Sequence, residues 1–243
     1  MAPRDEPGLL IEDYAVVGDT QTMALIGSNG SLDWLCMPRF DSPAMFAALL
    51  GDEGNGRWQI CPAGLAQGVV RRTTRRYREG TMVLETEWET DTGVVRLVDA
   101  MPPHDGHTDV VRRVEGVSGE VEMAMRWVIR FGYGEVVPWV RRITDTDGRP
   151  ALLAVAGPDA VVLRGDVVPE PDHRGGDRAH HAHFTVRAGE FVDSTMVWFP
   201  PTRTSRTPTL RRRASRACRP SGPSGRVARP TTARTPRPCS ARW

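Results

Sequence analysis

The spacing of apolar residues is the feature that most restricts how this chain can fold. Residues 81–90, TMVLETEWET, alternate between apolar and polar side chains, as a half-buried strand does. Residues 120–131, EVEMAMRWVIRF, place every second side chain from Val121 to Phe131 on one apolar face. About a dozen such runs follow one another, joined by short turns. The pattern predicts an all-β fold, an antiparallel β-sandwich with one short helix, followed by a disordered tail.

The segment from Met23 to Gly51 contains the clearest local signals. Residues 23–27 and 31–37 are short apolar runs, and Asn29-Gly30 between them suits a tight turn with positive φ. These residues are therefore predicted to form a β-hairpin. A second hairpin is predicted further along, with strands over 109–117 and 120–131 and its turn at Ser118-Gly119.

The residues after the first hairpin are predicted to form the short helix. Asp41 or Ser42 can cap its N-terminus, and Pro43 suits its first turn. AMFAALL supplies an apolar face, and Gly51 can end the helix in the left-handed conformation. The Pro-, Gly- and charge-rich segment 168–179 is predicted to be a loop.

Charge and composition exclude several classes of protein. The net charge of +2 divides unevenly: residues 201–243 contain 12 Arg and no acid, which leaves a net charge of −10 for residues 1–200. An acidic body is a poor surface for nucleic acid. No segment has the apolar core of a signal peptide or the roughly 18 apolar residues of a membrane span. We therefore expect a cytoplasmic protein with no membrane partner and no specific nucleic-acid partner.

Cysteine and histidine can form metal sites, but their spacing does not favour one here. The four cysteines form no CxxC pair, and Cys36 and Cys61 lie in predicted strands, as small buried hydrophobic residues do. A strand would place His181 and His183 on one face, with no carboxylate or cysteine partner at ligand spacing. We expect neither a metal ion nor a cofactor.

Several motifs occur in order near the start of the chain. They are Gly18-Asp19, Gly30-Ser31-Leu32-Asp33-Trp34, Pro38-Arg39-Phe40-Asp41-Ser42, the run from Phe46 to Gly51, and Gly56-Arg57-Trp58. With them the chain resembles the bacterial glycoside hydrolase family 15 proteins, the trehalases and glucoamylase-like enzymes. The resemblance covers residues 9–200 and implies a trehalase-like N-terminal β-sandwich that precedes an (α/α)6-barrel catalytic domain. Residues 1–8 are then an N-terminal extension, and residues 201–243 form a tail.

The resemblance also implies an activity in carbohydrate metabolism for full-length relatives. Family members cleave α-glucosidic bonds with inversion, and trehalose is the leading substrate. One glutamic acid protonates the leaving oxygen, and a second, about 6.5–9.5 Å away, activates water. In the family both lie on the barrel, so we expect no catalytic residue in this chain and no activity. Glu85, Glu87 and Glu89 share a predicted strand face, which is typical of a solvated surface.

Four residues of the matching segment are candidates for substrate binding: Asp33, Trp34, Arg39 and Asp41. Trp34 offers a flat apolar surface on which a sugar can stack, while Arg39 and Asp41 offer donors and acceptors for hydroxyl groups. On this interpretation they project toward the barrel and bind α-glucosides. The alternative, which we favour, places Trp34 in the core, Asp41 at the helix cap and Arg39 in an ion pair.

Residues 201–243 are nearly all Arg, Pro, Ser, Thr, Ala and Gly and lack periodicity. The composition is typical of disorder, and a basic tail can also bind nucleic acid or membranes nonspecifically. A third explanation fits better. Read one nucleotide back, the possible codons of 221–243 permit a Phe-Trp…Trp pattern and a Gly-Pro-Tyr…Glu-Ala-Val run, similar to the family's entry into its first barrel helix. We therefore expect a frameshift near residue 200.

Two other classes of function stay open at this point. One is a free-standing carbohydrate-binding module, which would bind α-glucosides without hydrolysing them. The other is an interaction protein whose basic tail gives salt-dependent binding.

Overall fold

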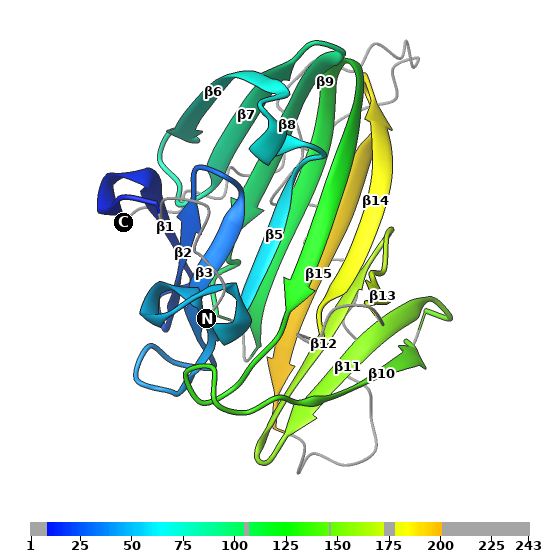
Figure 1. The fold of residues 1–243 in the computed structure, drawn as a ribbon. Helices are drawn as coiled ribbons and strands as arrows, with labels where there is room; N and C mark the ends of the chain where they lie inside the picture. Colours follow the sequence, from blue (N-terminus) through cyan, green and yellow to red (C-terminus); the bar gives the residue numbers. More distant parts are fainter. Residues whose placement is uncertain (1–8, 105–106, 146, 173–177, 201–243) are drawn as a thin grey trace, which may run out of the picture.

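A computed structural model describes residues 9–104, 107–145, 147–172 and 178–200 of the chain. The proposed N-terminal extension over 1–8 and the tail over 201–243 lie outside the described residues. Within the described residues, fifteen strands form one continuous antiparallel ladder, which folds over on itself into two facing layers (Figure 1). The predicted all-β sandwich is therefore confirmed. Within the described ranges, no helix is long and apolar enough to cross a membrane.

Each layer is an antiparallel sheet, and the two share strand β9 (Thr108–Val128). The first sheet contains β1 (Tyr14–Gly18), β2 (Met23–Gly27), β3 (Ser31–Cys36), β4 (Ala44–Ala47), β5 (Arg57–Pro62), the second half of β9, β14 (His180–Arg187) and β13 (Glu170–Pro171). The second sheet contains β6 (Val70–Tyr77), β7 (Leu84–Thr90), β8 (Gly93–Ala100), the first half of β9, β15 (Phe191–Phe199), β12 (Asp159–Gly165), β11 (Pro150–Ala156) and β10 (Trp139–Thr144). Short 3₁₀ turns complete the fold: η1 (Ile11–Asp13), η2 (Ala48–Leu50), η3 (Glu53–Asn55) and η4 (Leu65–Gln67).

Strand β9 corrects the prediction of a second hairpin. Residues 108–115 pair with β15, and residues 120–127 pair with β14 and in part with β5, so the two halves do not pair with each other. The strand bends from one layer into the other between Gly116 and Gly119 (Figure 1). Gly119 has φ +63, and a Cβ on Gly116 would lie 2.1 Å from the carbonyl oxygen of Arg187. The predicted turn at Ser118-Gly119 is therefore wrong: these residues lie within β9, at its bend, and the pairing partners come from distant strands.

The first hairpin is confirmed, whereas the predicted helix after it is wrong. β2 and β3 pair across the turn, where Gly30 has φ +73. Residues 44–47 form strand β4, which pairs with β3, and only Ala48–Leu50 make a 3₁₀ turn. A lone helix of seven residues is marginal. A fourth strand instead buries Ala44, Met45, Phe46 and Ala47 completely while it pairs their backbone groups with β3.

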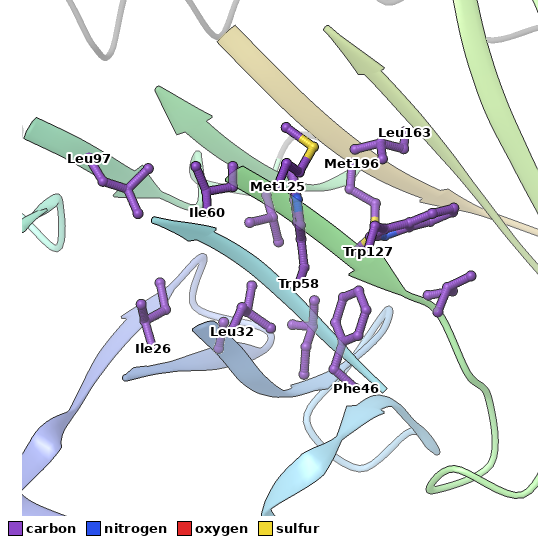
Figure 2. Packing of buried hydrophobic residues seen from close by; sticks show 14 of the residues in the cluster. Ile26, Leu32, Phe46, Trp58, Ile60, Leu97, Met125, Trp127, Leu163 and Met196 are labelled. Carbon is purple, nitrogen blue, oxygen red and sulfur yellow. The ribbon is translucent and has the colours of Figure 1, made fainter. Parts of the chain in front are cut away.

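The core lies between the two layers, as the close view in Figure 2 shows. Trp58 on β5 and Trp127 on β9 come from the first sheet, and Leu163 on β12 and Met196 on β15 face them from the second. The apolar face predicted for residues 121–131 is confirmed, because every second residue from Val121 to Phe131 is buried in this cluster.

One ion pair is also buried in this core. Arg112 on β9 is fully buried and donates to the Asp99 Oδ1 atom on β8 at 2.8 Å. The same guanidinium donates to the backbone carbonyl oxygens of Gly30, at 2.7 Å, and Trp58. Asp99 belongs to the second sheet and the two carbonyls to the first. This side chain therefore links the two layers.

Candidate functional site

A β-bulge in β3 sets the position of the first two candidate residues. Ile26 lies opposite Leu32, but Leu25 lies opposite Trp34, so Asp33 is the extra residue on β3. Leu32 and Leu35 consequently both point into the main core although they are three residues apart. The bulge leaves Asp33 and Trp34 together on the other face of the strand.

Asp33 is buried and its oxygens are already used. The hydroxyl of Tyr14 donates to Oδ2 at 2.8 Å, and the hydroxyl of Ser31 donates to Oδ1. Burial, together with the negative charge of Asp33 and its hydrogen bond, raises the pKa of the Tyr14 phenol. These contacts tie β1 to β3, so the carboxylate of Asp33 has a structural role in holding the bulge.

Trp34 is half-buried and lies outside the main core. It packs on a small cluster formed by Cys36, Ala44 and Ala47, and its ring lies 6.2 Å from the ring of Tyr133, centroid to centroid. Cys36 and Cys61 are both buried and free, as expected from their positions in strands.

Arg39 and Asp41 pair with each other in solvent. Arg39 Nε donates to Asp41 Oδ1 at 3.0 Å, and both side chains are 57% exposed. The hydrogen bond from Arg39 lowers the pKa of Asp41. Asp41 caps no helix, because the turn after it leads into β4. The predicted cap is therefore wrong, while the predicted ion pair of Arg39 is confirmed. The hydrogen bonds of Asp33 lead away from this pair, so the four candidates do not converge on one pocket.

Several exposed apolar side chains lie in the segments that follow β3, β4 and β9. We call this set the exit-end surface and define it by Phe40, Leu50, Tyr133 and Val136, of which Phe40 is 68% exposed. The Tyr133 amide donates to the carbonyl oxygen of Ala44 at 3.1 Å, which joins the loop after β9 to the segment around Phe40.

The last strand ends beside this surface. Trp198 on β15 lies opposite Thr108 on β9, and the hydroxyl of Thr108 donates to the carbonyl oxygen of Pro38 at 3.4 Å. Phe40 belongs to one of the motifs that the sequence shares with the family, but the sequence reasoning did not single out Tyr133 and Val136. The YGEVVP run that contains them was a usable signal, because it places apolar residues in a loop between two strands.

The acidic face of β7 is paired rather than solvated. Glu85 is buried and accepts hydrogen bonds from Arg76 Nε at 2.9 Å and Arg78 Nε at 2.6 Å, and Glu87 accepts from Arg96. Burial opposes ionisation of Glu85, but the two arginines outweigh it and lower the pKa of this carboxyl. The predicted solvated face thus fits Glu89 only. A general acid needs a raised pKa, so Glu85 is poorly suited to that role.

Two histidines on β14 each lie near one carboxylate. His181 Nε2 lies 3.8 Å from Asp172 Oδ2, and His183 Nδ1 lies 3.8 Å from Glu122 Oε1. Among the residues that the structure describes, no group of three or more His, Cys, Asp or Glu is placed to hold a metal ion.

Comparison with known proteins gives the context for this fold. The sequence matches the family described as trehalase-like, N-terminal, over residues 5–189. Trehalase from Mycolicibacterium smegmatis is 37% identical over 145 residues, which cover 52% of this chain and 21% of that protein. Trehalase from Mycobacterium tuberculosis is 32% identical over 178 residues, or 65% of this chain and 25% of that protein. Trehalase 1 from Sulfolobus acidocaldarius is 33% identical over 129 residues, which cover 53% of this chain and 21% of that protein.

The alignments therefore span between 21% and 25% of the length of these relatives. The family match covers every described strand from β1 to β14 and ends just before β15. On this evidence the chain belongs to the trehalase-like N-terminal domain family.

Proposed function

We propose that this chain is the non-catalytic N-terminal domain of a glycoside hydrolase family 15 enzyme that acts on α-glucosides, with trehalose as the substrate. The observation that carries the proposal is the family match over residues 5–189, together with relatives that are named trehalases. The electrostatics of the domain support a non-catalytic role, because Arg76 and Arg78 hold the buried carboxylate of Glu85 and lower its pKa.

The role proposed for the domain is to pack against the catalytic domain through the exit-end surface. Interfaces between domains of one chain typically bury about 600–1,500 Å². Phe40, Leu50, Tyr133 and Val136 are exposed in the described structure, and Thr108, which lies opposite Trp198 near the end of β15, donates to the carbonyl oxygen of Pro38, two residues before Phe40. Phe46 is completely buried and so is no part of this surface, and Trp198 is half-buried with its Nε1 donating to Asp159 at 2.9 Å.

An activity assay tests the first half of this proposal. The purified 243-residue chain should release no glucose from trehalose, maltose or starch, whereas the same strands joined to a family 15 catalytic barrel should hydrolyse an α-glucoside. Turnover that co-purifies with the 243-residue chain through several columns would refute the non-catalytic role.

Light scattering tests the second half. Residues 1–200 alone should self-associate, because exposed apolar patches beyond a few hundred Å² promote association. Replacing Phe40 and Leu50 by Ser should reduce the self-association. Phe191→Ser is the matched control, since Phe191 is also exposed but lies at the opposite end, across from Glu115 near the bend of β9. A monomeric 1–200 at high concentration would contradict the docking role and favour a free-standing carbohydrate-binding module.

A further inference from the structure

A cavity of about 380 Å³ opens next to the exit-end surface, between the start of β10 and the start of β14. Its lining includes Ile129, Arg130, Trp139, Asp172, Arg178 and His180. The volume falls within the range of about 300–1,000 Å³ that is usual for small-molecule sites. None of these residues belongs to the four candidates suggested by the sequence.

The imidazole of His180 is the first sign that the cavity takes a ligand. The residue is only 7% exposed, and its Nδ1 atom is buried without a hydrogen-bond partner among the described residues. Its ring meets the ring of Trp127 edge-on at 5.6 Å. Burial, and then the neighbouring His181, lower the pKa of His180, which favours the neutral imidazole. A neutral imidazole offers one donor and one acceptor, and a buried polar atom of this kind favours a polar partner.

Trp139 supplies the second sign, an open aromatic surface. It is 68% exposed at the start of the edge strand β10. The guanidinium of Arg141 lies over the ring, 5.4 Å from its centroid, and so occupies one face of the indole. With so much of the side chain exposed, the other face is accessible to a flat partner.

The charged groups around the cavity indicate which kind of partner fits. Arg130 and Arg178 provide donors, while Asp172 provides acceptors and opposes the entry of an anion. Arg130 is buried, with Nη1 donating to the carbonyl oxygen of Ile129 at 2.8 Å, so its guanidinium is held in place. A mixture of donors and acceptors beside an indole suits a neutral ligand that has many hydroxyl groups and an apolar face.

We propose that this cavity is a binding site for a neutral pyranose sugar. The sugar ring stacks on the open face of Trp139, and its hydroxyl groups bond to His180 Nδ1, Asp172 and Arg130. The site lies wholly within the domain and does not depend on hydrolysis. The sugar-site proposal can therefore fail while the proposed function stands, and the proposed function can fail while the sugar site stands.

Saturation-transfer NMR on the full chain, with trehalose and maltose as probes at millimolar concentration, tests the site. Trp139→Ala should weaken the apparent affinity about tenfold, because it removes an aromatic stacking contact, and Trp139→Phe should restore much of it. His180→Phe keeps a ring of similar shape but removes the polar atoms, and should also reduce binding. The melting temperature of each variant reports whether the fold is intact. Because Trp139 is largely exposed, its replacement should leave the melting temperature unchanged.

The matched control is Trp34→Ala, which removes the half-buried tryptophan outside the cavity and should leave sugar binding unchanged. Absence of any signal with both sugars would refute the proposal. So would equal binding by the wild type, Trp139→Ala and His180→Phe, or loss of binding in Trp34→Ala alone. Competition by inorganic phosphate would show an anion site instead, and would equally refute a neutral sugar site.

Discussion

Replacing Arg112 by Met tests whether the buried ion pair holds the two layers together. Arg112 is fully buried and makes a 2.8 Å hydrogen bond to Asp99 and hydrogen bonds to the carbonyls of Gly30 and Trp58. Methionine fills similar space but makes none of these bonds, so Asp99 is left buried and uncompensated. Breaking a buried pair from one side costs about 3–5 kcal/mol. We therefore expect Arg112→Met to lower the free energy of unfolding by this amount.

Urea unfolding followed by tryptophan fluorescence measures this loss. In a domain of this size, about 3–5 kcal/mol corresponds to a decrease in melting temperature of roughly 6–20 °C. The double variant Arg112→Met, Asp99→Leu should recover part of the stability, because it removes the orphaned carboxylate as well. Arg187→Met is the matched control: Arg187 pairs with Glu120 at 3.0 Å, but both side chains are more than half exposed, so its loss should cost about 0–1 kcal/mol.

The pH dependence gives a second test of the same ion pair. Burial raises the pKa of Asp99 in the folded protein, and Arg112 opposes that rise. A carboxyl with a raised folded pKa contributes stability below its unfolded pKa of about 3.9 and loses it as the pH rises through the folded value. Without Arg112 the folded pKa rises further, so Arg112→Met should lose stability more steeply than the wild type above about pH 4. Equal stability of Arg112→Met and Arg187→Met, with parallel pH profiles, would refute the reasoning.

Three further changes follow from the structure. Asp41→Ala and Asp41→Asn should have similarly small effects on the melting temperature, because Asp41 forms an exposed ion pair with Arg39. A large decrease for Asp41→Ala alone would contradict this and support the helix-cap interpretation. Gly30→Ala should destabilise the domain strongly in urea unfolding, since φ is +73 and the new Cβ would lie 2.2 Å from the carbonyl oxygen of Ile60; an unchanged midpoint would contradict this geometry. Burial raises the pKa of the Cys61 thiol to about 11. Mass spectrometry should therefore show slow alkylation of Cys61 in the folded chain and fast alkylation in urea. Equal alkylation rates would show that the thiol is accessible in the folded chain.

Much of the fold was predictable because side-chain alternation is a local property. The sandwich, the hairpin around Gly30 and the buried face from Val121 to Phe131 all follow from residues that are neighbours in the sequence. The family resemblance also rests on short local motifs, and the match over residues 5–189 confirms it.

The candidate site was less predictable, because its geometry depends on partners far away in the sequence. Asp33 and Trp34 share a face only because of a bulge against β2, and Asp33 is held by Tyr14, 19 residues earlier. The sequence suggested a cap for Asp41, but residues 44–47 bury more surface and pair more backbone as a strand on β3 than as a short helix.

The sequence by itself determined which side chains alternate, where turns can form and which family the chain belongs to. Only the tertiary structure decided that β9 serves both layers, that Arg112 is buried, and that Trp139 and His180 line one cavity. The physical reason is that alternation fixes the face of a strand on which a residue lies but not the strand that pairs with it. A charged residue such as Arg112 is stable in the core only when it bonds there to a carboxylate and to carbonyl groups that are distant in the sequence. The residues next to Arg112 in the sequence do not reveal which partners those are.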